Sequence, residues 1–369
     1  MKTSRNASVR AFMNNRINRR DFLARTAMAT LAFGSASALR GQPEGQRSKM
    51  GLVSYVFNVH HKAAKTNKTL VDLNDPLNFL EECHRLGAGG MQVPLGVRDQ
   101  TYLNNLRKQA ERYGMHVEAM LDFPRNDADL DHFEKQLISA KTVGATVARM
   151  TMLPGRRYEE FKTRGDYDHA CEQGLKSLRL AEPVAARHKF RLAVENHKDH
   201  LVAEKLEVLK QISSEYVGLC VDVINNFALL EDPLETVRAF APYAMTVHFK
   251  DESIRESEDG FWLADEALGD GFLDLPALLG VLRQAKPDVR FNLETITRDP
   301  ILVPVRTEQY WATFPGRPRS AMDPMLKLAR EKGVAQQILV SRLPTAQQLE
   351  LERRNVERSL RFAREKLML

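Results

Sequence analysis

Four polar residues at the ends of short apolar runs indicate the chemistry that this sequence can do. Glu195 lies in RLAVEN, Asp222 in VGLCVD, His248 in AMTVHF and Glu294 in RFNLET. Such runs form buried strands, and an ionised carboxylate there is costly unless a positive charge offsets it. Three carboxylates and one imidazole at strand ends therefore indicate a site for a divalent metal ion.

The spacing of these four residues is that of a repeated strand–helix unit. The gaps between them are 27, 26 and 46 residues. The first two gaps fit one unit each, and the third fits a unit that carries a long loop. We therefore expect the four side chains to come from successive strands.

The rest of the chain from Met50 alternates in the same way. Helix starts are marked by an aspartate followed by a proline at Asp75-Pro76 and Asp232-Pro233, and by Asp274 before LPALLGVLRQA. Eight strands alternating with about eight helices predict a closed (β/α)₈ TIM barrel, an α/β fold. A doubly wound open sheet is the alternative, although the turn after the first strand, FNVHHKAAK, lacks a GxGxxG motif. Besides the four runs above, the expected strands are 50–57, 89–95, 115–123 and 145–153.

Two long insertions and a charged tail extend this pattern. The insertions run from Lys250 to about Asp270 and from Thr295 to about Ala321, and each follows a strand. In a barrel such loops lie over the carboxyl ends of the strands, where the chemistry takes place. Beyond Leu343 the sequence predicts one long helix, whose apolar stripe packs on the barrel or on a second subunit.

The basic excess of the chain is confined to its first 38 residues. They contain seven Lys or Arg residues and one acid, which leaves 47 of the 54 basic and 47 of the 48 acidic residues from Leu39 onward. The neutral remainder offers no electrostatic footprint for nucleic acid. The segment Arg19–Leu23 resembles a twin-arginine export motif, and an apolar stretch ending in Ala-Ser-Ala follows it. From this motif we expect export to the periplasm or cell envelope. The apolar stretch is too short to span a bilayer, so we expect no stable membrane insertion.

Taken together in this order, the motifs resemble those of the xylose isomerase-like TIM barrels, the sugar phosphate isomerase/epimerase superfamily. The resemblance extends from Met50 to about Lys332 and implies a metal ion held by Glu195, Asp222, His248 and Glu294. The motifs that carry it are Glu195-Asn196-His197, Asp222-x-x-Asn225, His248-x-Lys250-Asp251, Gly269–Asp274 and Glu294.

The resemblance and the ligand chemistry imply a metal-dependent isomerase or epimerase of a sugar or polyol that acts through a metal-bound enediolate. A related dehydratase or lyase uses the same intermediate. Oxygen ligands with one imidazole suit one Mn²⁺ ion, with Mg²⁺, Co²⁺ or Zn²⁺ as alternatives. By resemblance, Glu195 and Glu294 are the catalytic acid and base, although either glutamate could be a ligand only.

Further residues are expected to contact a small carbohydrate substrate. His197 and Lys250 lie two residues beyond Glu195 and His248, so strand alternation directs them to the same side. Lys250 could instead pair with Asp251 or Asp222, and Asn225 could cap a helix. From the second insertion we expect Arg298 and Trp311, the latter stacking on a sugar ring unless it packs in a core. Arg149, near the end of the fourth strand, is expected to form a structural ion pair.

Two other functions remain open at this stage. An apurinic endonuclease shares this barrel, but it binds DNA and needs more histidine ligands. A non-catalytic carbohydrate-binding barrel is the second alternative, which the intact ligand quartet disfavours. The expected organisation is a signal peptide (1–38), a linker (39–49), the barrel (50–333) and a C-terminal helical extension (334–369), with assembly into a homo-oligomer left open.

Overall fold

The computed structural model describes residues 47–369, and in it eight parallel strands close into a barrel. The signal peptide predicted over 1–38 lies outside the described residues. The barrel strands are β1 (Gly51–Val53), β2 (Gly90–Pro94), β3 (His116–Met120), β4 (Val147–Met150), β5 (Arg191–Glu195), β6 (Val217–Asp222), β7 (Ala244–Phe249) and β10 (Phe291–Leu293).

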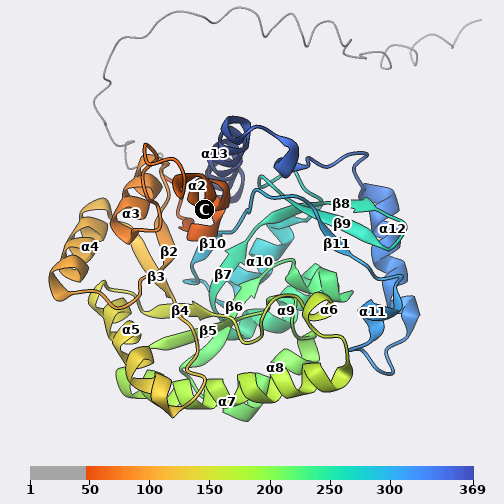
Figure 1. The fold of residues 1–369 in the computed structure, drawn as a ribbon, viewed down its shortest axis with the longest axis horizontal. Helices are drawn as coiled ribbons and strands as arrows, with labels where there is room; N and C mark the ends of the chain where they lie inside the picture. Colours follow the sequence, from red (N-terminus) through yellow and green to blue (C-terminus); the bar gives the residue numbers. More distant parts are fainter. Residues whose placement is uncertain (1–46) are drawn as a thin grey trace, which may run out of the picture. The chain divides into compact units, whose positions relative to one another are not determined.

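Each barrel strand pairs in parallel with the strands before and after it, and β10 closes the barrel by pairing with both β7 and β1. The register places Asp222 opposite His248, and His248 opposite Asn292. This confirms the predicted TIM barrel (Figure 1). It also brings the carboxyl ends of β5, β6, β7 and β10 to one rim.

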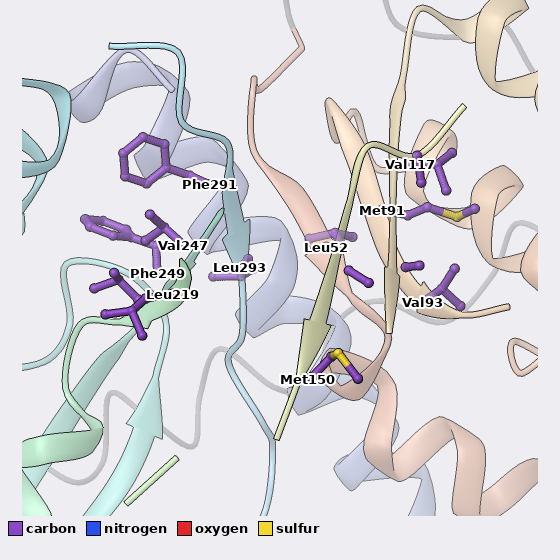
Figure 2. Close-up of a cluster of buried hydrophobic side chains, with 14 of the residues drawn as sticks. Leu52, Met91, Val93, Val117, Met150, Leu219, Val247, Phe249, Phe291 and Leu293 are labelled. Carbon is purple, nitrogen blue, oxygen red and sulfur yellow. The ribbon is translucent and has the colours of Figure 1, made fainter. Parts of the chain in front are cut away.

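The strands are buried on both faces, and successive side chains alternate between them. In β7, Val247 and Phe249 face the layer between strands and helices, where Figure 2 shows them beside Phe291 and Leu293 of β10. The intervening residues of these strands point into the barrel. The apolar layer outside the strands therefore supplies the core, and the interior is free to carry polar groups.

Three helices begin at the aspartates that the sequence marks as helix starts. The side chain of Asp75 accepts the backbone N–H groups of Leu77 and Asn78, and Asp232 and Asp274 cap their helices in the same way. The helices are α2 (Asn58–Ala64), α3 (Pro76–Arg85), α4 (Gln100–Tyr113), α5 (Leu130–Thr142), α6 (Arg157–Glu160), α7 (Arg164–His188), α8 (Val202–Ile212), α9 (Pro233–Phe240), α10 (Leu275–Ala285), α11 (Glu308–Trp311), α12 (Asp323–Lys332) and α13 (Thr345–Phe362).

The first strand is shorter than predicted. It ends at Val53, residues 54–57 form a 3₁₀ turn, and α2 occupies the segment expected to be an irregular turn. The carboxylate of Glu352, on α13, accepts the backbone N–H groups of Val59 and His60 in the first turn of α2. The backbone donors at the start of α2 are thus satisfied by a side chain nearly three hundred residues away in the chain, which the local sequence could not reveal.

The two long insertions form one additional sheet. The first insertion folds into the antiparallel pair β8 (Asp251–Glu256) and β9 (Phe261–Glu266), and β11 (Ile301–Val303) of the second adds to β9. This three-stranded sheet lies beside α12 (Figure 1). Residues from both insertions share one apolar cluster, which includes Phe261, Leu263, Val303 and Tyr310.

The C-terminal helix α13 packs on the barrel, as one of the two expected alternatives predicted. Val356 and Leu360 of α13 and the following Ala363 and Leu367 belong to the main apolar core. The Ser48 hydroxyl donates to the Leu369 carbonyl, so the end of the chain meets the start of the described part. Within residues 47–369, no helix is long and apolar enough to span a membrane.

Candidate metal centre

The four residues singled out from the sequence converge at the carboxyl end of the barrel. Glu195 and Asp222 are the last residues of β5 and β6, His248 lies in β7, and Glu294 follows β10 directly. One ligand atom from each can be chosen so that all four lie within 4.8 Å of one another, and all four residues are buried. We refer to these residues, with Arg149 and Lys250, as the ligand layer.

The orientation of the His248 ring is fixed by a hydrogen bond to Gln92. Its Nε2 lies 2.7 Å from Gln92 Oε1, while the amide nitrogen of Gln92 donates to Glu118 at 3.1 Å. Because that second bond settles which end of the Gln92 amide is oxygen, Nε2 of His248 must be the donor. Nδ1 then faces Glu294 Oε1 at 3.3 Å and Glu195 Oε1 at 3.7 Å, without a hydrogen-bond partner among the described residues.

Two buried cations lie against the carboxylates of the layer. Arg149 forms an ion pair with Glu195, and the Lys250 ammonium lies 2.9 Å from Asp222 Oδ2 and 3.0 Å from Glu294 Oε2. The contact with Asp222 is within ion-pair distance but lacks hydrogen-bond geometry. Arg149 thus forms the ion pair expected of it, and its partner is a proposed ligand. The sequence left Asp251 and Asp222 open as partners of Lys250. In the structure Lys250 pairs with Asp222, and also with Glu294.

Two asparagines position the carboxylates further. Asn196 exchanges hydrogen bonds with the Asp222 backbone at 2.8 and 2.9 Å, which joins the ends of β5 and β6. Asp222 Oδ1 accepts the backbone N–H groups of Ile224 and Asn225, so that its Oδ2 is the oxygen turned toward the layer. The Asn225 amide donates to Glu195 Oε1 at 3.1 Å. Asn225 therefore does not cap a helix with its side chain but contacts the candidate ligands.

The pKa values of these groups follow from burial and from neighbouring charges. Burial opposes ionisation of Glu195, but Arg149 and His248 lower its pKa below the usual value; Lys250 and His248 do the same for Glu294. For Asp222 burial prevails, and its pKa is raised. Burial also disfavours a charged His248, yet Cys220, Glu294 and Glu195 raise its pKa well above the usual value.

The donor set fits a divalent metal ion. Surroundings that favour a proton on His248 favour any other cation at the same place. Its Nδ1 is buried, faces two carboxylates, and has no hydrogen-bond partner within residues 47–369. Three carboxylates and one imidazole match the preferences of Mn²⁺ and related ions. The cluster could therefore bind such an ion, whose identity these residues alone do not fix.

A cavity of about 420 Å³ opens beside the ligand layer. Of the residues predicted to contact substrate, His197, Asn225, Lys250 and Arg298 line it, and so does Glu294. Sequence reasoning did not identify Tyr55, Arg156, Glu159 or Lys198 as part of this wall. The complete lining is Tyr55, Arg149, Thr151, Gly155, Arg156, Glu159, Glu160, His197, Lys198, Asn225, Lys250, Glu294, Ile296 and Arg298.

Trp311 does not reach this cavity. Its indole N–H donates to the Val305 carbonyl at 2.7 Å, and its ring packs edge-on against Tyr310 in the apolar cluster of the insertions. The expected stacking of Trp311 on a sugar ring is therefore not supported by its position. The alternative that the sequence left open, packing within a core, describes it correctly.

The glycine motif before α10 has a structural role. The carboxylate of Asp251 accepts the backbone N–H groups of Gly269, Gly271 and Leu273. A Cβ atom added at Gly271 would lie 2.1 Å from Asp251 Oδ1, so only glycine permits this close approach. The motif thus fixes the loop that follows β9 and leaves Lys250, beside Asp251, to face the ligand layer.

A second polar layer lies deeper in the barrel. Glu118 Oε2 accepts hydrogen bonds from Gln92 at 3.1 Å, Thr246 at 2.6 Å and Asn292 at 2.9 Å. His116 Nε2 lies 3.4 Å from Asn292 Oδ1, and we refer to these five residues as the network layer. Gln92, Glu118 and Asn292 each interrupt an apolar strand, the same signal that identified the ligands, but sequence reasoning did not single them out.

Comparison with known proteins gives a family and one curated relative. The profile of the family described as xylose isomerase-like TIM barrel matches residues 80–314. The 3-oxo-isoapionate decarboxylase of Pectobacterium atrosepticum is 25% identical over 222 residues, which cover 58% of this chain and 76% of that protein.

Solved structures with similar folds were also found. A xylose isomerase domain protein from Planctomyces limnophilus is 16% identical with a TM-score of 0.48, covering 68% of this chain and 90% of its own. A D-psicose 3-epimerase from Clostridium cellulolyticum H10, crystallised with D-tagatose, is 14% identical with a TM-score of 0.48, covering 71% and 94%. At this level of similarity we draw nothing about function from either structure.

Proposed function

This chain belongs to the xylose isomerase-like TIM barrel family, and from that premise we propose that it is a metal-dependent isomerase or epimerase of a carbohydrate, acting through an enediolate. The observation that carries the proposal is the ligand layer, where four donor groups converge and His248 Nδ1 is directed at two carboxylates. A divalent ion bound there would act as a Lewis acid that stabilises negative charge developing on substrate oxygens.

The residues of the layer provide the proton-transfer groups for such a reaction. Glu294 lines the cavity and has Oε2 next to the Lys250 ammonium, so it is placed to remove a proton from a bound substrate. Glu195 is fully enclosed, with Arg149 on one oxygen and Asn225 on the other. We propose Glu195 and Glu294 as the acid/base pair, and the geometry supports Glu294 more directly.

Cavity residues would hold the substrate while the proton moves. Lys250 is placed to donate to a substrate oxygen, and the buried His197 Nδ1 has no partner within the described residues and could do the same. Asn225 donates to Glu195 and accepts from Lys250. It therefore connects a group that would contact the substrate with a proposed metal ligand. Direct binding of the carbohydrate by these three side chains is part of the proposal.

Hydrogen exchange with solvent tests this function. Protein loaded with Mn²⁺ is incubated in D₂O with a panel of ketoses and inososes, and the products are followed by NMR. We expect deuterium at the carbon next to the carbonyl in product or recovered substrate, and none with Asp222→Ala. Complete retention of the substrate hydrogen during turnover would instead indicate intramolecular hydride transfer and reduce both glutamates to ligands.

A decarboxylase of a sugar-derived 3-oxo acid is the second candidate. The curated relative is by its name such an enzyme, and the cavity wall carries several cations. In that reaction the bond to the carboxylate breaks, CO₂ leaves, and the electron pair of that bond forms an enolate, which then takes a proton from a cavity group such as the Lys250 ammonium. Release of CO₂ from a 3-oxo sugar acid, without isomerisation of any ketose, would favour this candidate.

Export by the twin-arginine route is a separate proposal that rests on Arg19-Arg20 and the apolar segment after them. We expect the double change of Arg19 and Arg20 to lysine to leave the protein in the cytoplasm with its presequence uncut. Cell fractionation and the mass of the mature chain measure this. Processing of the variant at the wild-type rate would contradict the proposal.

A further inference from the structure

Lys198 is a buried cation in the cavity wall whose charge is poorly compensated. The residue is 5% exposed, and its ammonium donates to the Asn225 side-chain oxygen. Among residues 47–369, the one carboxylate within ion-pair range is Glu252, whose Oε1 lies 4.0 Å away. By contrast, Lys250 has two carboxylate oxygens at 2.9 and 3.0 Å.

The backbone holds Lys198 in a conformation that residues with a side chain rarely adopt. Its φ is +60°, in the left-handed region. The Asp199 carboxylate accepts the backbone N–H groups of His197 and His200 on either side, and the Lys198 carbonyl accepts the N–H of Arg157. The turn that presents this lysine to the cavity is therefore fixed by its neighbours, as is common for strained residues at functional sites.

Arg298 supplies a second cation on the same wall. One of its terminal nitrogens lies 3.0 Å from Asp265 Oδ2, whereas its Nε is buried and has no hydrogen-bond partner within the described part of the chain. Both Lys198 and Arg298 line the cavity. A donor left without a partner in a cavity wall favours a ligand that accepts hydrogen bonds.

The net charge of the groups around the ligand layer indicates which charge a ligand in the cavity should carry. Ion pairs connect five buried carboxylates, those of Glu195, Asp222, Glu252, Asp265 and Glu294, with four cations, those of Arg149, Lys198, Lys250 and Arg298. With His248 neutral as a ligand, a divalent ion changes this excess of one negative charge into an excess of one positive charge. At the rim, Arg156 pairs with Glu159 and Glu160 is exposed, where solvent screens their charges.

We propose that Lys198 and Arg298 form a binding site for a carboxylate group of the substrate, so that the protein acts on a sugar acid in preference to a neutral sugar. This inference rests on the proposed function, because the excess positive charge arises only with a divalent ion in the ligand layer. One carboxylate neutralises one excess charge, and the Lys198 ammonium and the Arg298 guanidinium, which both line the cavity, are donors of the kind that binds a carboxylate. A phosphate would add about two negative charges at neutral pH and leave an uncompensated one.

Three sugars that differ only at C6 test the proposal, namely D-fructose, D-fructuronate and D-fructose 6-phosphate. Their binding to Mn²⁺-loaded protein is measured by calorimetry, which requires no turnover. We expect D-fructuronate to bind about ten- to a hundredfold more tightly than D-fructose, the range of a charge-assisted hydrogen bond. Lys198→Met should remove that preference with D-fructose binding little changed, whereas Lys198→Arg should keep most of it. Lys210→Met, an exposed lysine on α8, is the matched control.

The other outcomes separate this proposal from the proposed function. Equal binding of D-fructose and D-fructuronate, or an unchanged preference in Lys198→Met, would overturn the carboxylate site. Tighter binding of D-fructose 6-phosphate than of D-fructuronate would overturn the choice of a carboxylate. If the acid binds through Lys198 but the protein exchanges no substrate hydrogen in D₂O with any of the three sugars, the carboxylate site stands and the proposed function fails.

Discussion

The two polar layers inside the barrel lie on the same inner strand faces but are built in different ways. In the network layer, three neutral side chains donate to one oxygen of Glu118. Its other oxygen is buried without a hydrogen-bond partner among the described residues, and Glu118 also lines a second cavity of about 280 Å³. In the ligand layer, charged groups face one another and His248 Nδ1 has no partner among the described residues. The difference indicates that the first layer fixes geometry while the second keeps atoms available for a ligand.

Glycines beneath the network layer support this division. Gly51 and Gly90 are register partners on β1 and β2, and a Cβ at either would come within 3 Å of the His116 ring. The ring therefore fits inside the barrel only because both residues lack side chains. From the His116 ring a chain of hydrogen bonds runs through Asn292, Glu118 and Gln92 to the ring of His248.

The largest expected effect is loss of the metal from the ligand layer. His248→Ala removes the imidazole ligand and should reduce bound Mn²⁺ from about one per chain to less than a tenth of that, with turnover lost accordingly. Elemental analysis after dialysis measures this. The control is His60→Ala, which removes a ring that lies outside the ligand layer and hydrogen-bonds to the Val71 carbonyl. A wild-type protein that binds no metal even after Mn²⁺ loading would contradict the assignment of the layer.

How much of this site the sequence predicts depends on the range of the contacts involved. Glu195, Asp222, His248 and Glu294 were predicted because a charged residue at the end of an apolar strand is conspicuous, and a barrel brings such ends together. The cavity residue Lys198 gave no signal, since nothing in the local sequence marks a lysine with positive φ. The pairing of β9 with β11 joins segments about forty residues apart, and this hid the core position of Trp311.

A second expected effect separates the two layers by the property that each controls. Glu195→Gln and Glu294→Gln remove a basic site and should lower turnover by about two to four orders of magnitude, more than they lower metal content. Glu118→Gln should do the reverse, because a neutral amide oxygen accepts the three hydrogen bonds of the network more weakly than a carboxylate oxygen does; we expect a loss of about 1–3 kcal/mol in the free energy of unfolding. Steady-state rates and urea unfolding measure the two properties. The division of roles fails if Glu118→Gln lowers turnover as much as Glu294→Gln does.

A smaller effect tests the single hydrogen bond that joins the layers. Gln92→Leu leaves His248 Nε2 without an acceptor, so the ring loses its fixed orientation while every proposed ligand remains. We expect Mn²⁺ affinity to fall about ten- to a hundredfold, the usual range for groups that orient metal ligands. Competition with a chelator measures the affinity, and Gln92→Glu, which keeps an acceptor, should recover part of it. An affinity equal to wild type in Gln92→Leu would show that the two layers act independently.

The smallest expected effect concerns the charge of the network layer. Burial lowers the pKa of His116, although Glu118 nearby opposes this, so the folded protein favours a neutral ring where the unfolded chain has a pKa near 6.5. The unfolded state therefore binds more protons as the pH falls from about 6.5 toward the folded pKa, and stability declines in that window by at most about 1.4 kcal/mol per pH unit. His116→Gln cannot titrate and should flatten this part of the curve, measured by urea unfolding between pH 5 and 8. An unchanged slope would mean that the ring accepts a proton inside the barrel, and the network layer would then share the charged character of the ligand layer above it.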